Sequence, residues 1–310
     1  MKTIKSLQNE RGTMTFLREP LARRMWLYQK ALIAILLAGT VVQSEATVYT
    51  IGARDTSMQI DLTGGITQWA VDGVNQLSLQ SFYYSIGSGP TASIFSIGAP
   101  SAPSITTNIS NTTVALNTTY ANSTIGVGTL YSLQSSPVGS GKATLAQTLT
   151  INNVSATTQV FHFYQFSDFN LGGIAGGQNV QFSSNGSGQQ YQVVQTDAFG
   201  RTLIGLITGV TGGGSAQSEV QAGLFDGVQF GLGGINPVTL NNTLTAGPGN
   251  VDFAYEWDAT LAPGSSITIS EIQTVPEPSS MALAVSGIFA LALRCRRRLV
   301  GQRDGRSSRA

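Results

Sequence analysis

Apolar and polar residues alternate with a period of two along much of the chain between residues 47 and 276. Over residues 251–258, Val, Phe, Tyr and Trp occupy every second position, with Asp, Ala and Glu between them. Such a pattern predicts a β-strand with one apolar and one solvated face. Similar stretches predict further strands over residues 58–62, 77–86, 145–151, 159–169, 191–195 and 202–207, and from residue 267 onward.

The stretch over residues 159–169 is apolar or aromatic on both faces, so we expect it in the middle of a sandwich, covered on both sides or facing a ligand groove. Asn152-Asn153 and Pro263-Gly264 mark turns. No long amphipathic helical period occurs in this part of the chain. Many short strands with glycine-rich turns predict an all-β body, a β-sandwich over residues 47–274. A β-helix is the alternative, weakened because no repeat period is present.

Residues 100–124 are rich in Ser, Thr and Asn and almost without charge. This composition fits either strands with polar outer faces or a long loop, and the sequence leaves the choice open.

An apolar run near the N-terminus predicts export. Basic residues precede the 12 apolar residues 31–42, and Ser44 and Ala46 supply the small side chains of a signal peptidase site. Twelve helical residues span about 18 Å, too short to cross a hydrocarbon core of about 30 Å stably. Residues 1–46 are therefore predicted to be a signal peptide handled by the secretion machinery, with a retained anchor as the alternative. The pair Arg23-Arg24 also resembles a twin-arginine export motif, although ordinary secretion is preferred.

A second apolar run, residues 279–293, lies near the C-terminus and predicts a short transmembrane helix of about 22 Å, better suited to a temporary anchor than to a permanent one. The cations that follow it should stay on the cytoplasmic side, together with a polar tail over residues 299–310. These membrane-anchoring cations are Arg294, Arg296, Arg297 and Arg298. Ahead of the run, Pro276 and Pro278 exclude a helix and should leave Glu277 extended and accessible to a processing enzyme.

The tripeptide, the short apolar run and the arginine cluster together resemble the PEP-CTERM sorting signal of Gram-negative bacteria, over about residues 275–298. The resemblance implies processing by exosortase, a membrane enzyme found in species that make extracellular polysaccharide. It also implies that Pro276, Glu277 and Pro278 are recognised by exosortase and perform no chemistry themselves. The tail over residues 299–310 is a departure, since such signals usually end soon after the basic cluster. An ordinary tail anchor is the alternative.

Charge and cysteine content exclude several classes of function for the body. Residues 47–276 hold three basic and eleven acidic residues, a net charge of −8. Without clustered Lys and Arg, nucleic-acid binding is not expected. The single cysteine, Cys295, lies within the basic cluster, so the body has no disulfide, zinc thiolate site or cysteine nucleophile. No cofactor is predicted.

Candidate chemistry in the body is sparse. His162 is the only histidine and is expected to be a packed or hydrogen-bonded core residue. Asp252, Glu256 and Asp258 share one strand face and are expected to be solvated there. They could bind calcium or hydrolyse glycosides only if distant strands converged on them. We therefore predict no catalytic residue and no metal site.

Aromatic residues suggest a sugar-binding role as an alternative to simple core packing. Phe163 and Trp257 are the candidate carbohydrate contacts. The leading functional hypothesis is a non-enzymatic protein of the cell surface or extracellular matrix, anchored only transiently in the membrane and linked to extracellular polysaccharide. A carbohydrate-binding module of that matrix is the second hypothesis, and a secreted glycan hydrolase is the third.

Overall fold

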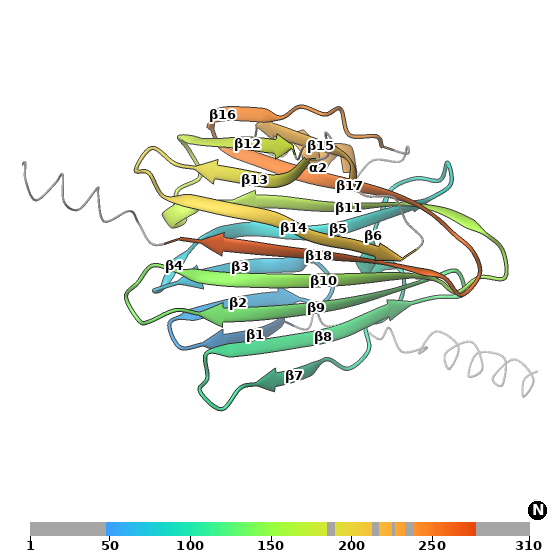
Figure 1. Ribbon diagram of the computed structural model, residues 1–310, viewed down its shortest axis with the longest axis horizontal. Coiled ribbons are helices and arrows are strands. Elements are labelled where there is room, and N and C mark those ends of the chain that lie inside the picture. The colour runs from blue at the N-terminus through green and yellow to red at the C-terminus, as the bar shows by residue number, and fades with distance from the viewer. Residues whose placement is uncertain (1–47, 185–189, 213–216, 225–226, 233–237, 277–310) are drawn as a thin grey trace, which may run out of the picture. The chain divides into compact units, whose positions relative to one another are not determined.

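The computed structural model describes residues 48–184, 190–212, 217–224, 227–232 and 238–276. Strands dominate them, as the sequence predicted (Figure 1). One sheet contains β1 (Val48–Ala53), β2 (Thr56–Asp61), β3 (Gly65–Val71), β4 (Val74–Asn75), β5 (Leu77–Ile86), β6 (Ala92–Ser93), β11 (Gln159–Phe169), β15 (Gln217–Leu224) and β17 (Val251–Leu261). The other contains β7 (Ser104–Thr107), β8 (Thr113–Ala121), β9 (Ile125–Ser135), β10 (Ala143–Asn153), β12 (Gln178–Ser184), β13 (Gln190–Thr196), β14 (Thr202–Gly212), β16 (Thr245–Gly249) and β18 (Ser266–Val275).

The two sheets are antiparallel and pack face to face, which confirms the prediction of an all-β fold with a sandwich body. In the first sheet the order is β1-β2-β3-β5-β11-β17-β15, with β4 on β3 and β6 on β5. In the second sheet it is β16-β12-β13-β14-β18-β10-β9-β8-β7. Short helical turns are η1 (Ile94–Ser96), η2 (Leu171–Gly173) and α2 (Gly227–Leu232).

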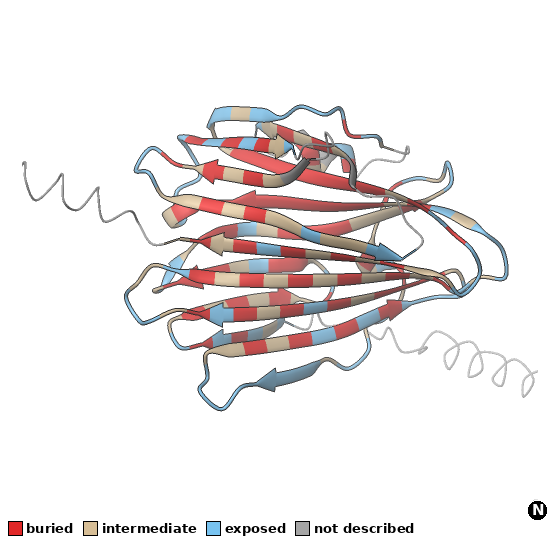
Figure 2. Cartoon of the chain, in the orientation of Figure 1, coloured by how far each residue is buried: buried red, intermediate tan, exposed pale blue. Residues whose placement is uncertain are grey.

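The main core lies between the inner faces of the two sheets. Alternate side chains of β10 are buried, and Figure 2 shows red alternating with tan or pale blue along β8 and most of β9. Aromatic rings fill the centre, where Phe163 stacks on Phe82 at a centroid distance of 6.0 Å and Phe253 stacks on Phe169 at the same distance. Aromatic burial of this kind contributes most to the stability of a sandwich.

β11 lies between β5 and β17 in the first sheet, and from Phe163 onward it is buried on both faces, as its apolar sequence predicted. Its outer face packs in a second, smaller hydrophobic cluster. The members of this cluster are Tyr164, Phe166, Ala254, Val228, Leu232 and Leu240. Residues of α2 and of the segment 238–240 thus cover part of the outer face of the first sheet.

That cover corrects the prediction of a solvated face on β17. Every residue from Val251 to Trp257 is buried, on both faces of the strand, including Asp252 and Glu256. The alternation of charged and aromatic residues identified the strand correctly, but solvent reaches only the far end of the outer face, near Asp258.

Residues 100–124 form strands with polar outer faces, and the long-loop alternative is excluded. β7 and β8 pair from Ser104 opposite Asn117 to Thr107 opposite Val114. The turn expected at Asn152-Asn153 lies slightly later, because β10 continues through Asn153. The buried Asn153 amide donates to the carbonyls of Thr157 and Leu261, at 2.8 Å each, and so holds the turn that follows.

Several predicted features lie outside the described residues. These are the signal peptide with Ser44 and Ala46, the greater part of the sorting signal, and the polar tail. Of the recognition tripeptide, only Pro276 is described, directly after β18. Within the described ranges, no helix is both long and apolar enough to cross a membrane.

Candidate functional site

A cluster of three titratable side chains lies on the outer face of the first sheet. His162 of β11 and Asp258 of β17 are directly opposite in the antiparallel ladder, so their side chains share one face. His162 Nδ1 lies 2.5 Å from Asp258 Oδ1 and 3.8 Å from Glu256 Oε1. His162 and Asp258 are partly exposed, whereas Glu256 is buried.

Glu256 is a buried carboxyl with a raised pKa. Burial raises its pKa from the usual 4.5 to about 7, and the charges of Asp258 and Glu219 act in the same direction. The backbone N–H of Leu240 donates to Glu256 Oε2 at 2.8 Å and partly opposes that shift, as does His162. Glu256 therefore exchanges its proton near neutral pH, which is a common property of functional carboxyls.

Tyr164 lies beside this cluster, because it is paired with Glu256 across the ladder. Its hydroxyl donates to the carbonyl of Val238 at 2.5 Å. Burial, and next the charge of Glu256, raise the pKa of Tyr164, so that the phenol stays a donor at physiological pH. Together, Tyr164 and Glu256 bind both ends of the segment 238–240 to the sheet.

The three side chains of this cluster could together bind a divalent cation. Donor atoms of His162, Glu256 and Asp258 all lie within 4.8 Å of one another. A cation about 2.1 Å from each donor holds neighbouring donors roughly 3 Å or more apart. The hydrogen bond between His162 and Asp258 is shorter than that, so it would have to open before a cation could enter.

The set of acids singled out in the sequence does not converge. Asp252 is six residues from Asp258 on the same strand, which at about 3.3 Å per residue places them roughly 20 Å apart. The partner that the fold supplies is instead His162, 96 residues away from Asp258 in the chain. His162 is hydrogen-bonded, as predicted, but at the edge of solvent rather than deep in the core.

The predicted carbohydrate contacts are wrong for a physical reason. Phe163 and Trp257 are directly opposite on the inner face of the sheet, and both are buried in the main core. Their ring centroids are 6.3 Å apart, and Trp257 also stacks on Tyr255 at 5.6 Å. Neither ring offers a face to a sugar, so both are core residues.

The sorting residues are placed only in part. Pro276 follows the last strand directly and is half-buried. Glu277, Pro278 and the arginines Arg294, Arg296, Arg297 and Arg298 lie outside the described residues, as do Ser44 and Ala46.

Comparison with solved structures finds partial structural similarity at low sequence identity. A bacterial glucoamylase in complex with acarbose aligns with a TM-score of 0.47 and 9% identity, over 79% of this chain and 35% of the enzyme. A putative aldose 1-epimerase from Escherichia coli aligns with a TM-score of 0.42 and 12% identity, over 74% of this chain and 99% of that protein. A galactose mutarotase-like protein from Lactobacillus casei gives 0.40 and 9%, over 74% and 99%.

Sequence comparison is informative at the C-terminus alone. Among curated proteins, none matches this chain. The family model of the PEP-CTERM protein-sorting motif matches residues 274–298, the region where the sequence showed the tripeptide, the apolar run and the basic cluster. The chain therefore carries a PEP-CTERM protein-sorting motif that begins in the final two residues of β18, the last described strand.

Proposed function

We propose that this protein is exported, held transiently in the inner membrane by residues 279–293, and processed by exosortase. Its sandwich then serves a non-enzymatic role at the cell surface or in the extracellular matrix, linked to extracellular polysaccharide. The match of residues 274–298 to the sorting motif carries the proposal. The body contains no cysteine, so its folding after export would require no disulfide bond.

The end of β18 supports access to the motif. The ladder between β10 and β18 ends at the pair Ala143 and Val275, one residue before the tripeptide begins. Pro276 and Pro278 have no backbone N–H to extend a ladder. A processing enzyme would therefore not need to unfold the sandwich to reach its recognition residues.

Replacing Pro276, Glu277 and Pro278 together by alanine tests this proposal in the native host. We expect the variant to remain uncut in the inner membrane, while the unchanged chain is cut and released. A matched control replaces Ser279 and Ser280 by alanine, which alters the adjacent positions and keeps the tripeptide. Release of the triple variant at the unchanged rate would refute recognition of this motif.

A second candidate function is carbohydrate binding on the outer face of the first sheet. The observation in its favour is the partly exposed pair of His162 and Asp258 beside the buried Glu256. The half-buried ring of Tyr83, on β5, lies on the same face, next to Tyr164, which is itself buried. Sugar hydroxyls need such convergent donors and acceptors near an aromatic ring.

Titration calorimetry with extracellular polysaccharide from the producing strain tests this second function. Asp258→Asn should weaken binding at least about tenfold if the pair contacts sugar directly, since a charge-assisted hydrogen bond is lost. Asp61→Asn, an acid-to-amide change on β2 away from the cluster, is the control. Equal affinity in all three proteins would exclude this face as the binding site.

A further inference from the structure

The end of the sandwich where β18 stops has a surface unlike the rest of the body, and we call it the exit end. Val275 pairs with Ala143, which pairs with Ser135, so the β9–β10 loop lies beside the point where the chain leaves. Thr274 pairs with Ile204, which places the β13–β14 loop on the other side. Figure 1 shows these loops together at the left, with the turns of β1–β2, β3–β4 and β7–β8.

Hydrogen bonds join the two sheets at the exit end. Asp72, in the turn between β3 and β4, accepts from the backbone N–H groups of Gly139 at 2.8 Å and Gly141 at 2.6 Å. The N–H of Asp72 in turn donates to the carbonyl of Asp55, in the turn between β1 and β2, at 2.9 Å. Turns of both sheets therefore form one continuous surface around the point where the chain leaves.

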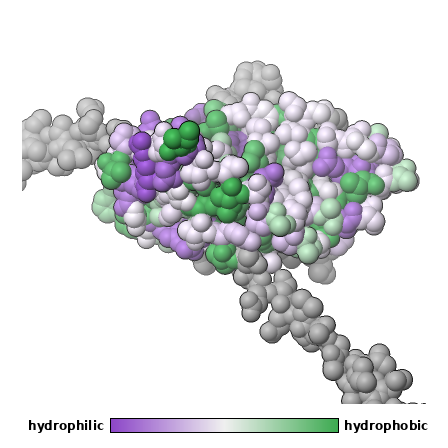
Figure 3. Space-filling view, turned by 90° about the horizontal axis from the view of Figure 1, so that it is seen from below, coloured by the Kyte–Doolittle hydropathy of each residue, from purple (hydrophilic) through white to green (hydrophobic). Residues whose placement is uncertain are grey.

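Apolar side chains protrude from this surface at the tips of its loops. The three most exposed large hydrophobic residues of the described chain are Ile109 at 107%, Val138 at 77% and Phe199 at 70%. They come from the β7–β8, β9–β10 and β13–β14 loops, and all lie at the exit end. Seen from below in Figure 3, hydrophobic residues lie exposed among hydrophilic ones toward the left of the molecule, the side of the exit end.

The basic residues of the body gather at the same end. Arg54 lies in the β1–β2 turn, Lys142 directly precedes β10, and Arg201 directly precedes β14. These are the three basic residues between residues 47 and 276, although the net charge of that stretch is −8. The acids at this end are Asp55, Asp72, Asp168, Asp197 and Asp252; Asp168 and Asp252 are buried, and Asp197 is paired with Arg201. Arg54 and Lys142 are exposed and make no ion pair with another described residue.

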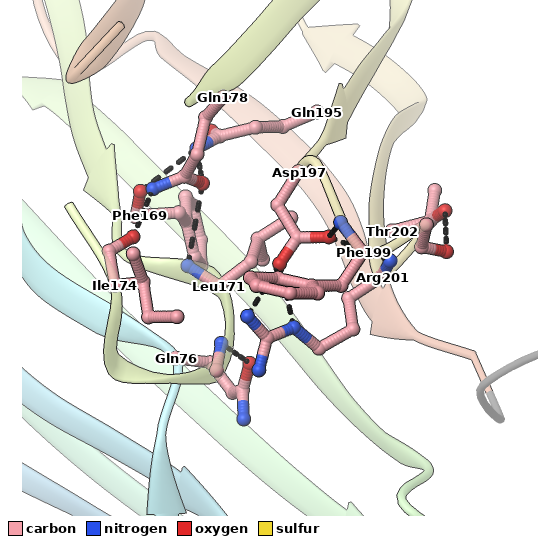
Figure 4. A network of polar contacts seen from close by, with 12 residues as sticks. Gln76, Phe169, Leu171, Ile174, Gln178, Gln195, Asp197, Phe199, Arg201 and Thr202 are labelled. Carbon is pink, nitrogen blue, oxygen red and sulfur yellow. Dashed lines mark hydrogen bonds and ion pairs between the residues drawn. The ribbon is translucent and has the colours of Figure 1, made fainter. Parts of the chain in front are cut away.

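One of these loops is held rigidly in position, as Figure 4 shows. Asp197 Oδ1 accepts from the N–H groups of Phe199 at 2.9 Å and Arg201 at 2.8 Å, while Oδ2 accepts from Arg201 Nε at 2.6 Å. The guanidinium carbon lies 5.2 Å from the centroid of the Phe199 ring. The guanidinium also occupies the space that a Cβ would take at Gly172. Phe199 is therefore exposed to solvent on a loop whose conformation is fixed by these hydrogen bonds.

The length of the connection limits how far this end can lie from a bilayer. Four residue steps separate Val275 from Ser279, where the apolar run begins. Fully extended, they reach about 14 Å. The headgroup region on each side of a bilayer is roughly 5–8 Å thick. An anchored chain therefore keeps its exit end at or just above the headgroups.

We propose that, while the chain is anchored, the exit end rests on the bilayer itself, with Val138 and Phe199 inserted at headgroup level and Arg54 and Lys142 facing anionic lipid. This inference rests on the anchor of the proposed function. Apolar tips combined with cations are the surface that binds interfaces containing anionic lipid. The contact would hold the tripeptide at a fixed height beside a membrane-embedded processing enzyme.

Fluorescence quenching in vesicles tests the contact with the full chain. The chain is reconstituted in phosphatidylethanolamine and phosphatidylglycerol at about 3:1, with bromine on the acyl chains. Phe199→Trp places a reporter at the exit end, and Val154→Trp, at a residue 50% exposed at the opposite end, is the matched control. Native Trp69 and Trp257 are buried in the core, and Trp26 precedes the N-terminal apolar run, so quenching is measured relative to the unsubstituted chain, which contains all three.

We expect position 199 to be quenched at least about threefold more than position 154, and Arg54→Glu with Lys142→Glu to reduce that difference. Equal quenching at the two positions in chains that float with the vesicles would overturn the contact and leave the anchor intact. Chains that do not float with vesicles would overturn the anchor, and the contact with it. The flotation step thus separates failure of the proposed function from failure of this inference.

Discussion

The buried carboxyl of Glu271 makes a quantitative prediction about stability and pH. Glu271 lies on the inner face of β18, where the side-chain amides of Gln165, from the opposite sheet, and Gln273, at 3.2 Å, donate to it. Burial raises its pKa from 4.5 to about 7, although both hydrogen bonds act to lower it. We predict that Glu271→Gln becomes increasingly stabilising as the pH rises.

The sign follows from linkage between protonation and folding. Between pH 4.5 and 7 the folded protein holds the Glu271 proton more tightly than the unfolded chain does. Its contribution to stability is therefore fully present below pH 4.5 and is lost as the pH rises through 7. A shift of about 2.5 pKa units corresponds to about 3 kcal/mol at most.

The amide should be accommodated at this position. The side-chain oxygens of Gln147, Gln165 and Gln273 are buried without a hydrogen-bond partner among the described residues, so they can accept from a new NH₂ group. The difference in unfolding free energy between Glu271→Gln and the unchanged protein should therefore increase by about 3 kcal/mol from pH 4.5 to pH 8.5.

Urea unfolding at five pH values, followed by tryptophan fluorescence, measures this difference. Comparing variant and unchanged protein at each pH cancels the contribution of Glu256, which titrates in the same range. Gln147→Met, at the residue directly opposite Glu271 in the ladder, keeps the Glu271 carboxyl, so its effect should lack the gain in relative stability that Glu271→Gln shows as the pH rises. A pH-independent difference for Glu271→Gln would refute the reasoning.

Three further changes test other parts of the structure. Gly205→Ala should destabilise by about 1–3 kcal/mol, because its Cβ would lie 2.7 Å from a methyl of Val193, and the urea midpoint measures this. Trp257→Ala should cost about 3–5 kcal/mol as a core truncation, and a near-neutral effect in the same assay would contradict its burial. Tyr164→Phe leaves the carbonyl of Val238 without its donor, so the segment 238–240 should exchange its amide hydrogens faster while the midpoint falls by the equivalent of about 1–3 kcal/mol. Unchanged exchange there would show that this hydrogen bond does not hold the segment.

Local periodicity predicted individual strands well and their surroundings poorly. β5 and β11 have the predicted bounds, because alternation and turn residues are properties of neighbouring positions. The solvated face expected on β17 is buried, because Leu240 and α2 cover it from elsewhere in the chain. A local sequence pattern cannot predict that a distant segment covers a strand face.

The candidate site escaped prediction for the same reason. The two-residue period of a strand places Glu256 and Asp258 on the same face. It does not predict that β11 pairs with β17 and so brings His162 close to them. Likewise, Phe163 and Trp257 are residue types that often contact sugars. Only the fold shows that both point to the inner face of the sheet, where they fill the core. The sorting motif was predictable because it is read as a linear sequence.

The position of β18 has a mechanical consequence. This strand runs through the middle of the second sheet, hydrogen-bonded to β14 on one side and to β10 on the other. Its C-terminal end continues into residues 276–278, which we call the tether because they lead to the proposed membrane anchor. A pull on the tether acts along the strand axis, so the hydrogen bonds of both ladders bear the load in shear and must break together. An edge strand such as β7, pulled perpendicular to its axis, would lose its hydrogen bonds one at a time. If the chain is anchored through residues 279–293 as proposed, its attachment point is on the strand best placed to resist a pulling force.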